Sequence, residues 1–159
     1  MNSISTCSVF GHSKIVITKE LEDKVIATFE DLIKRGCKYF YFGGFGEFDD
    51  LCHKVISKLK ITYPHIQRIF CLSDPRHRKT SKRPKWLNTQ DYEEFIYLDL
   101  DFDWWYQRIY YRNLAMIDRS DIVVFYVEPK ENSGAYKAYK YAVKKKKKLI
   151  NLKQAEHNI

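Results

Sequence analysis

Apolar residues along this chain follow two alternating patterns, short unbroken runs and longer stretches with helical spacing. The short runs predict strands covered on both faces, as in a parallel sheet. The longer stretches predict amphipathic helices between those strands. The expected strands are Thr6–His12, Lys38–Phe42, Arg68–Leu72, Ile122–Val127 and Lys148–Leu152.

Four helices are expected between these strands. The first runs from Thr18 to Arg35 and is stopped by Gly36, a residue typical of helix C-termini. The second follows a glycine cluster and ends before Pro64, and the third spans Trp104 to Arg119. The fourth lies in "SGAYKAYKYAVKK", and "EFIYLDL" is either a short edge strand or an irregular segment.

Regular alternation of strands and helices predicts the fold class. It indicates an α/β protein with a Rossmann-like, doubly wound, mainly parallel sheet of about five strands flanked by helices. Neither an internal repeat nor a linker interrupts the pattern, so residues 1–159 are expected to form one domain.

The three turns at strand carboxyl ends are the candidate ligand site, because ligands of such sheets bind where the strand order reverses. One turn carries Gly11 and His12, with Lys14 nearby as an added charge. The second is "GGFG", and the third holds Ser133 and Gly134. The candidate phosphate-binding residues are therefore Gly11, His12, Gly43, Gly44, Phe45, Gly46, Ser133 and Gly134.

Two interpretations of the glycine cluster stay open. The second and third turns each lead into a helix, whose free N–H groups and partial positive charge favour phosphate. Glycines let such a backbone approach a ligand closely. The alternative is a tight strand-to-helix connection that contacts only the protein, because "GGFG" matches neither a dinucleotide fingerprint nor a P-loop.

The charge of the chain suggests a second class of binding partner, nucleic acid. The net charge of +8 favours anionic partners, although lysines that are simply solvated would give the same number. Two basic stretches, residues 76–85 and 144–148, are candidate nucleic-acid contacts. The first could instead be a solvated loop, and the second could complement a helix C-terminus.

The remaining composition argues against a metal-binding protein and against a membrane protein. The four cysteines include no C-x-x-C pair, so neither a zinc site nor any other metal site is expected, and a reduced cytoplasmic protein is the simpler interpretation. Asp99, Asp101 and Asp103 alternate without further ligand spacing. No apolar run approaches the length that crosses a bilayer, so no membrane partner is expected.

Three stretches carry a resemblance to a known family: "FGH", "GGFGEFD" and "RNLAMIDRSDIVVFYV" with the segment that follows it. Together they resemble the SLOG superfamily, which includes the cytokinin-activating LOG phosphoribohydrolases and the YpsA-like proteins. The chain is most similar to small bacterial YpsA-like members. The resemblance implies a Rossmann-like fold that binds nucleotides or nucleotide-derived ligands, with no separate cofactor.

The resemblance to LOG proteins centres on Arg112, with Asn113 beside it, and both are candidate ligand-binding residues. In those enzymes the following strand enters a loop whose glutamate works with the arginine to break an N-glycosidic bond. Here Lys137 and Ala138 stand where acids would be expected. The candidate catalytic residues are therefore Asp49, then Glu47, with Arg112 holding a phosphate. Asp49 could equally be a helix N-terminal acid.

These observations support one leading function and two alternatives. The leading function is binding of a nucleotide or an ADP-ribose-like ligand at the glycine-rich turns. The alternatives are a nucleoside 5′-monophosphate N-glycosidase and a nucleic-acid-binding protein. The aromatic helix Trp104–Arg119 is also a candidate surface for a homodimer.

Overall fold

Six parallel strands form a single sheet in the computed structural model, which describes residues 3–44, 46–98, 100–129 and 133–153. The strand order is β4-β3-β2-β1-β5-β6, so successive strands are added to one side of β1 and then to the other. The strands are β1 (Thr6–Gly11), β2 (Tyr39–Phe42), β3 (Gln67–Leu72), β4 (Glu94–Tyr97), β5 (Ile122–Tyr126) and β6 (Lys148–Asn151). The predicted α/β fold is confirmed.

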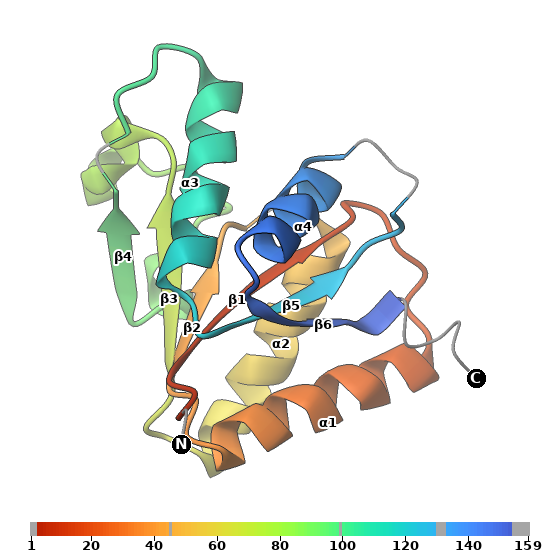
Figure 1. The fold of residues 1–159 in the computed structure, drawn as a ribbon. Coiled ribbons are helices and arrows are strands. Elements are labelled where there is room, and N and C mark those ends of the chain that lie inside the picture. The colour runs from red at the N-terminus through yellow and green to blue at the C-terminus, as the bar shows by residue number, and fades with distance from the viewer. Residues whose placement is uncertain (1–2, 45, 99, 130–132, 154–159) are drawn as a thin grey trace.

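Helices cover both faces of the sheet, as Figure 1 shows. The helices are α1 (Lys19–Lys34), α2 (Glu47–Thr62), α3 (Trp105–Arg119) and α4 (Gly134–Lys144). The apolar sides of α1 and α2 pack on one face, around Phe29, Phe40 and Phe48. On the other face, Met116 of α3 and Ala138 of α4 pack against β5. Each face therefore has its own apolar core.

The sheet has one strand more than the predicted five. The segment "EFIYLDL" supplies this strand, because β4 pairs in parallel with β3 as an edge strand. Packing of an apolar side chain explains why this segment forms a strand, because Phe95 of β4 packs against the rings of Phe70 and Tyr92. Part of the predicted "edge strand or irregular" segment is thus a strand, and Asp99 at its end lies outside the described residues.

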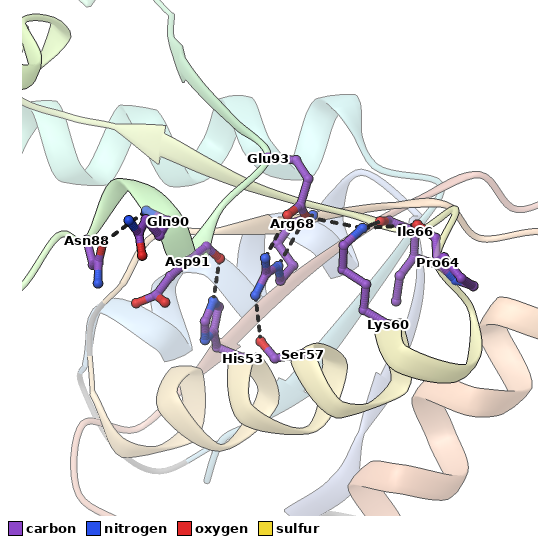
Figure 2. A network of polar contacts seen from close by, with 10 residues as sticks. All are labelled: His53, Ser57, Lys60, Pro64, Ile66, Arg68, Asn88, Gln90, Asp91 and Glu93. Atoms are coloured by element: carbon purple, nitrogen blue, oxygen red, sulfur yellow. Dashed lines mark hydrogen bonds and ion pairs between the residues drawn. The ribbon is translucent and has the colours of Figure 1, made fainter.

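A polar network fixes the approach to β4. Arg68 of β3 donates to both carboxylate oxygens of Glu93, at 3.1 and 2.6 Å, and to Ser57 of α2 at 3.0 Å. Lys60 of α2 donates at 2.6 Å to the carbonyl of Ile66, just before β3 (Figure 2). These contacts tie α2, β3 and the start of β4 together at the sheet edge.

The strand order reverses beside β1. From β1 the chain moves outward through β2, β3 and β4, and then returns to place β5 on the opposite side of β1. The β1–β5 register runs from Cys7 opposite Ile122 to Gly11 opposite Tyr126. Ligands of open α/β sheets bind at such a reversal, outside the carboxyl ends of the strands. No helix in the described ranges is long and apolar enough to cross a membrane.

Candidate functional site

A cleft lies at this reversal of strand order, and we call it the switch-point cleft. Its volume is about 270 Å³. The turn after β1, the turn after β2, and parts of α2, α3 and α4 form its walls. The described residues that line it are Phe10, Gly11, His12, Ser13, Gly43, Asp49, Trp105, Ile109, Arg112, Asn113, Ser133, Gly134 and Ala135.

The guanidinium of Arg112 is buried at this cleft, with the residue only 3% exposed. Nη1 donates to the carbonyls of Gly43 and Cys71, both at 3.3 Å. Nη2 donates to the side-chain oxygen of Asn113 at 2.9 Å. Within the described residues none of these acceptors is a carboxylate, so every hydrogen bond goes to a neutral group.

Burial lowers the pKa of Arg112, because water no longer solvates the charged form, while the nearby Asp49 favours that form. An arginine nevertheless keeps its proton in proteins. A buried cation whose hydrogen bonds reach only neutral acceptors favours an anion beside it. The cleft therefore has a positive group positioned for an anionic ligand.

Asp49, in the first turn of α2, is the acid of the cleft. It is 6% exposed, and its Oδ2 accepts a hydrogen bond from the backbone N–H of Gly44 at 3.1 Å. The carboxylate thus uses one of the N–H groups that the glycine turn was predicted to offer to phosphate. Asp49 and Arg112 line the same cleft, as the hydrolase hypothesis requires.

The glycines of the first two turns have neighbours within the protein. A Cβ on Gly11 would lie 2.4 Å from Phe48, and one on Gly43 would lie 2.5 Å from Nη2 of Arg112. At Gly44 and Gly46 the φ angles are +76° and +96°, which favour glycine. Close packing accounts for these four residues, so the glycine cluster itself is not evidence of a ligand.

Gly134 differs from these glycines. Among the described residues, no atom beyond its own chain neighbours would lie within 4 Å of a Cβ there, and its φ is not in the left-handed region. It opens α4, capped by Ser133, whose Oγ accepts from the N–H of Tyr136 at 3.1 Å. Both residues line the cleft, so the N-terminal turn of α4 faces it.

The other predicted residues occupy different places. His12 lies in the cleft wall, where its Nε2 accepts from the N–H of Glu128 at 2.8 Å. Glu47 accepts from the N–H of Ile15 at 2.8 Å and is not among the lining residues. It therefore holds the loop after β1. Phe45, a predicted ligand contact, lies outside the described residues.

Sequence reasoning missed several residues of the site. Trp105 and Ile109 of α3 line the switch-point cleft, and so does Ser13. A neighbouring cavity of about 150 Å³ shares Gly43, Arg112 and Trp105 with the cleft. Its further lining residues are Phe70, Ser73, Asp74, His77, Trp86, Arg108 and Ile109. Asp74 follows the carboxyl end of β3, and this position next to a strand end was the signal that could have pointed to the cavity.

The first basic stretch folds against β4 and the end of β3. It forms two short 3-10 helices, η1 (Pro75–Arg78) and η2 (Thr80–Lys82). The guanidinium of Arg83 lies 4.0 Å from the ring centroid of Phe95, and that of Arg78 lies 4.9 Å from that of Tyr97. Both arginines therefore stack on rings within the protein and have a structural role. Only His77 of this stretch lines the cavity next to the cleft.

The second basic stretch lies away from the cleft. Lys144 ends α4, Lys146 has a positive φ of 57°, and Lys148 begins β6. Because β6 starts here, the stretch sits at the amino ends of the strands, opposite the switch-point cleft. Lys147 donates to the backbone carbonyls of Asp118 and Ser120, which gives it a structural role.

Comparisons with known proteins support the fold. No family model matches the chain, and no curated protein matches it. Among solved structures, the X-ray structure of TM1055 is similar with a TM-score of 0.58 at 17% identity, over 92% of this chain and 72% of that chain.

Two structures of DNA processing protein A are also similar. The Helicobacter pylori protein, described for its single-stranded DNA binding mode, has a TM-score of 0.62 at 18% identity. The Streptococcus pneumoniae protein has a TM-score of 0.57 at 12% identity. Each match covers 92% of this chain, but only 64% and 49% of those longer chains. At these identities the likeness shows a shared fold.

Proposed function

We propose that the switch-point cleft binds a nucleotide or a nucleotide-derived ligand of the ADP-ribose type, with a phosphate facing Arg112. The observation that carries this proposal is the buried guanidinium of Arg112, whose hydrogen bonds reach only neutral acceptors in the described part of the chain. A phosphate there would meet a desolvated cation, where charge-assisted hydrogen bonds are strong.

The start of α4 also supports a phosphate at this place. Ser133 and Gly134 open α4 beside Arg112 in the cleft wall, and a helix N-terminus favours anions. The glycine turn is less suitable than the sequence suggested, because Asp49 already accepts from the N–H of Gly44. The phosphate in this proposal therefore faces α3 and α4.

Aromatic side chains offer a place for the base. Trp105 is 64% exposed and lines both the switch-point cleft and the neighbouring cavity, where Trp86 is 61% exposed. Exposed rings at the mouth of a site can stack on a nucleobase. A YpsA-like assignment within the SLOG superfamily is part of the same proposal.

A thermal-shift screen tests the proposal with nucleoside monophosphates, ADP-ribose and NAD against inorganic phosphate. A ligand at about one hundred times its Kd stabilises a protein by about 2.7 kcal/mol. For a chain of this size that raises Tm by about 5–10 °C. Binding that survives Arg112→Met unchanged would contradict the proposed phosphate position.

A second candidate function is hydrolysis of the N-glycosidic bond of a nucleoside monophosphate. The observation in its favour is that the carboxylate of Asp49 and the guanidinium of Arg112 line one cleft. Arg112 would hold the phosphate, and Asp49 would stabilise the oxocarbenium-like transition state or activate water.

Release of free base from a nucleoside monophosphate tests this second function. Asp49→Asn keeps the shape of the side chain, so it should abolish base release while nucleotide binding persists. Glu47→Gln is the matched control, because Glu47 contacts Ile15 rather than the cleft. No base release by the unaltered protein, with ligand binding intact, would leave a binding protein without this activity.

A further inference from the structure

A second concave surface runs away from the switch-point cleft, between α3 and α4. We call it the α3–α4 groove, and its volume is about 750 Å³. It shares Trp105, Ile109, Asn113 and Gly134 with the cleft, so the two are continuous. Its other lining residues are Tyr106, Gln107, Tyr110, Tyr111, Lys137, Lys140, Tyr141 and Lys144.

One wall of the groove is cationic. Lys137, Lys140 and Lys144 follow one another at helical spacing along α4, and all three are exposed. In the described ranges no carboxylate forms an ion pair with any of them. No acidic side chain is among the described residues that line the groove. This wall therefore favours a chain of negative charges.

The opposite wall presents aromatic rings. Trp105, Tyr106 and Tyr110 of α3 are 64%, 55% and 38% exposed and line the groove. Large rings are usually covered in a folded protein, so an exposed series of them along one helix points to a binding surface. A row of lysines facing a row of rings matches the alternating phosphates and bases of a single strand.

We infer that the α3–α4 groove binds single-stranded nucleic acid that carries a terminal phosphate. This inference rests on the proposed function, because the terminal phosphate occupies the place beside Arg112. The following nucleotides lie in the groove, with their phosphates toward Lys137, Lys140 and Lys144 and their bases toward Tyr106 and Tyr110. Of the groove lysines, only Lys144 belongs to the two basic stretches, residues 76–85 and 144–148, that the sequence suggested for nucleic acid.

Alternative occupants fit the groove less well. An acidic peptide would pair with the lysines but would leave the exposed rings of α3 without a stacking partner. A duplex keeps its bases stacked inside, so the rings would meet none of them. The single strand uses both walls at once.

Fluorescence anisotropy tests the inference with a labelled thymidine hexamer bearing a 5′-phosphate, a 3′-phosphate or neither. One terminally phosphorylated form should bind at least about tenfold more tightly than both the unphosphorylated hexamer and thymidine monophosphate. Lys137→Gln/Lys140→Gln/Lys144→Gln should weaken the hexamer about tenfold or more. It should also flatten the slope of log K against log salt by about 2, since each neutralised phosphate contributes about 0.7. Monophosphate binding should stay unchanged.

The matched control is Lys34→Gln/Lys54→Gln/Lys58→Gln, which removes the same charge from exposed positions on α1 and α2, on the other face of the sheet. It should leave hexamer affinity within about twofold of the unaltered protein. Tyr110→Ala tests the aromatic wall independently and should weaken the hexamer about fivefold or more, which corresponds to one lost base stack. Thermal melts confirm that each variant is folded.

Several outcomes would overturn the inference. Equal losses of hexamer affinity in the groove variant and the control variant would indicate general electrostatic attraction. Equal affinity for a duplex, or full displacement of the hexamer by polyglutamate with no effect of Tyr110→Ala, would remove the single-strand assignment. Monophosphate binding without any gain for the hexamer would leave the proposed function standing and overturn the groove, whereas no binding of the hexamer or of any nucleotide in the thermal-shift screen would overturn both.

Discussion

Arg112 and Gly43 are fitted to each other: Nη1 of Arg112 donates to the carbonyl of Gly43 at 3.3 Å, and a Cβ on Gly43 would lie 2.5 Å from Nη2. The absence of a side chain at Gly43 is what allows the guanidinium to lie against the backbone after β2. The buried cation of the switch-point cleft therefore depends on a glycine that is far away in the sequence.

Replacement of Gly43 by alanine should displace the guanidinium of Arg112 and weaken nucleotide binding about tenfold or more. Overpacking a buried position typically costs about 1–3 kcal/mol, so the free energy of unfolding should fall by that amount. Urea unfolding and ligand titration measure the two effects. Gly134→Ala is the control for stability, because a Cβ there meets no atom of the described residues within 4 Å and alanine favours a helix. Equal stability of the two variants would contradict the close fit.

Gly46→Ala should be the more damaging change in the glycine turn. Gly46 has a φ of +96°, and its Cβ would lie 2.5 Å from the backbone Cα of Ser13. The loss combines backbone strain of about 1–3 kcal/mol with a clash that backbone cannot easily relieve. We therefore expect Gly46→Ala to lower the free energy of urea unfolding more than Gly43→Ala does. A larger loss for Gly43→Ala than for Gly46→Ala would show that the loop after β1 shifts easily to make room for the added Cβ.

The ion pair between Arg68 and Glu93 should make the free energy of unfolding depend on pH in the acidic range. Burial alone would raise the pKa of Glu93, but the hydrogen bonds from Arg68 outweigh burial and hold this pKa below its usual range. Stability from such a carboxyl is fully present above the unfolded pKa and is lost as pH falls through the folded pKa. The free energy of unfolding should therefore drop as the pH falls below the ordinary glutamate value of 4.5.

Glu93→Gln isolates this contribution. It should cost about 1.5–3 kcal/mol at pH 7, where hydrogen bonds to a charged group are lost, and less at pH 3. Glu20→Gln, at an exposed position in the first turn of α1, should show no comparable loss at pH 7. Chemical denaturation at the two pH values measures the difference. A constant cost of Glu93→Gln at both values would rule out titration of this pair.

The four cysteines should resist alkylation in the folded protein. All four thiols are buried, and burial raises the pKa of Cys37 and of Cys71 to about 12. At neutral pH these groups are therefore protonated and shielded, and the thiol is a poor nucleophile. Mass spectrometry after iodoacetamide treatment should show unmodified native protein and four adducts after denaturation in urea. Fast labelling of the native protein would indicate local opening of the core.

Local patterns along the chain predicted most of the fold. Continuous apolar runs such as Ile122–Val127 belong to strands buried on both faces. The first helix was expected from Thr18, and the structure shows Thr18 as the N-cap of α1, accepting from the N–H of Leu21 at 3.0 Å. The edge strand β4 was harder to predict, because its Phe95 packs on Phe70 and Tyr92, and packing of this kind has no signal in the hydrophobic pattern of the strand itself.

The candidate site was predicted less completely. The sequence pattern predicted Gly43, Arg112 and Ser133 as parts of one ligand site, and the structure places all three in one cleft. It did not show that Asp49 would take the N–H of Gly44, nor that Trp105 would line the cleft, the neighbouring cavity and the groove. Both depend on how α2 and α3 cross the sheet, which spacing along the chain does not specify.

The central claim is tested most directly by calorimetric titration of a nucleotide hit from the screen into Arg112→Met and Arg119→Met. Both variants remove one guanidinium from α3, but Arg119 is exposed at the end of the helix away from the cleft. We predict that Arg112→Met loses binding at least about tenfold while the free energy of unfolding changes by less than about 2 kcal/mol, since relief of the buried charge offsets its lost hydrogen bonds. Arg119→Met should bind as the unaltered protein does. Full binding by a folded Arg112→Met variant would contradict the claim that this buried cation holds the phosphate.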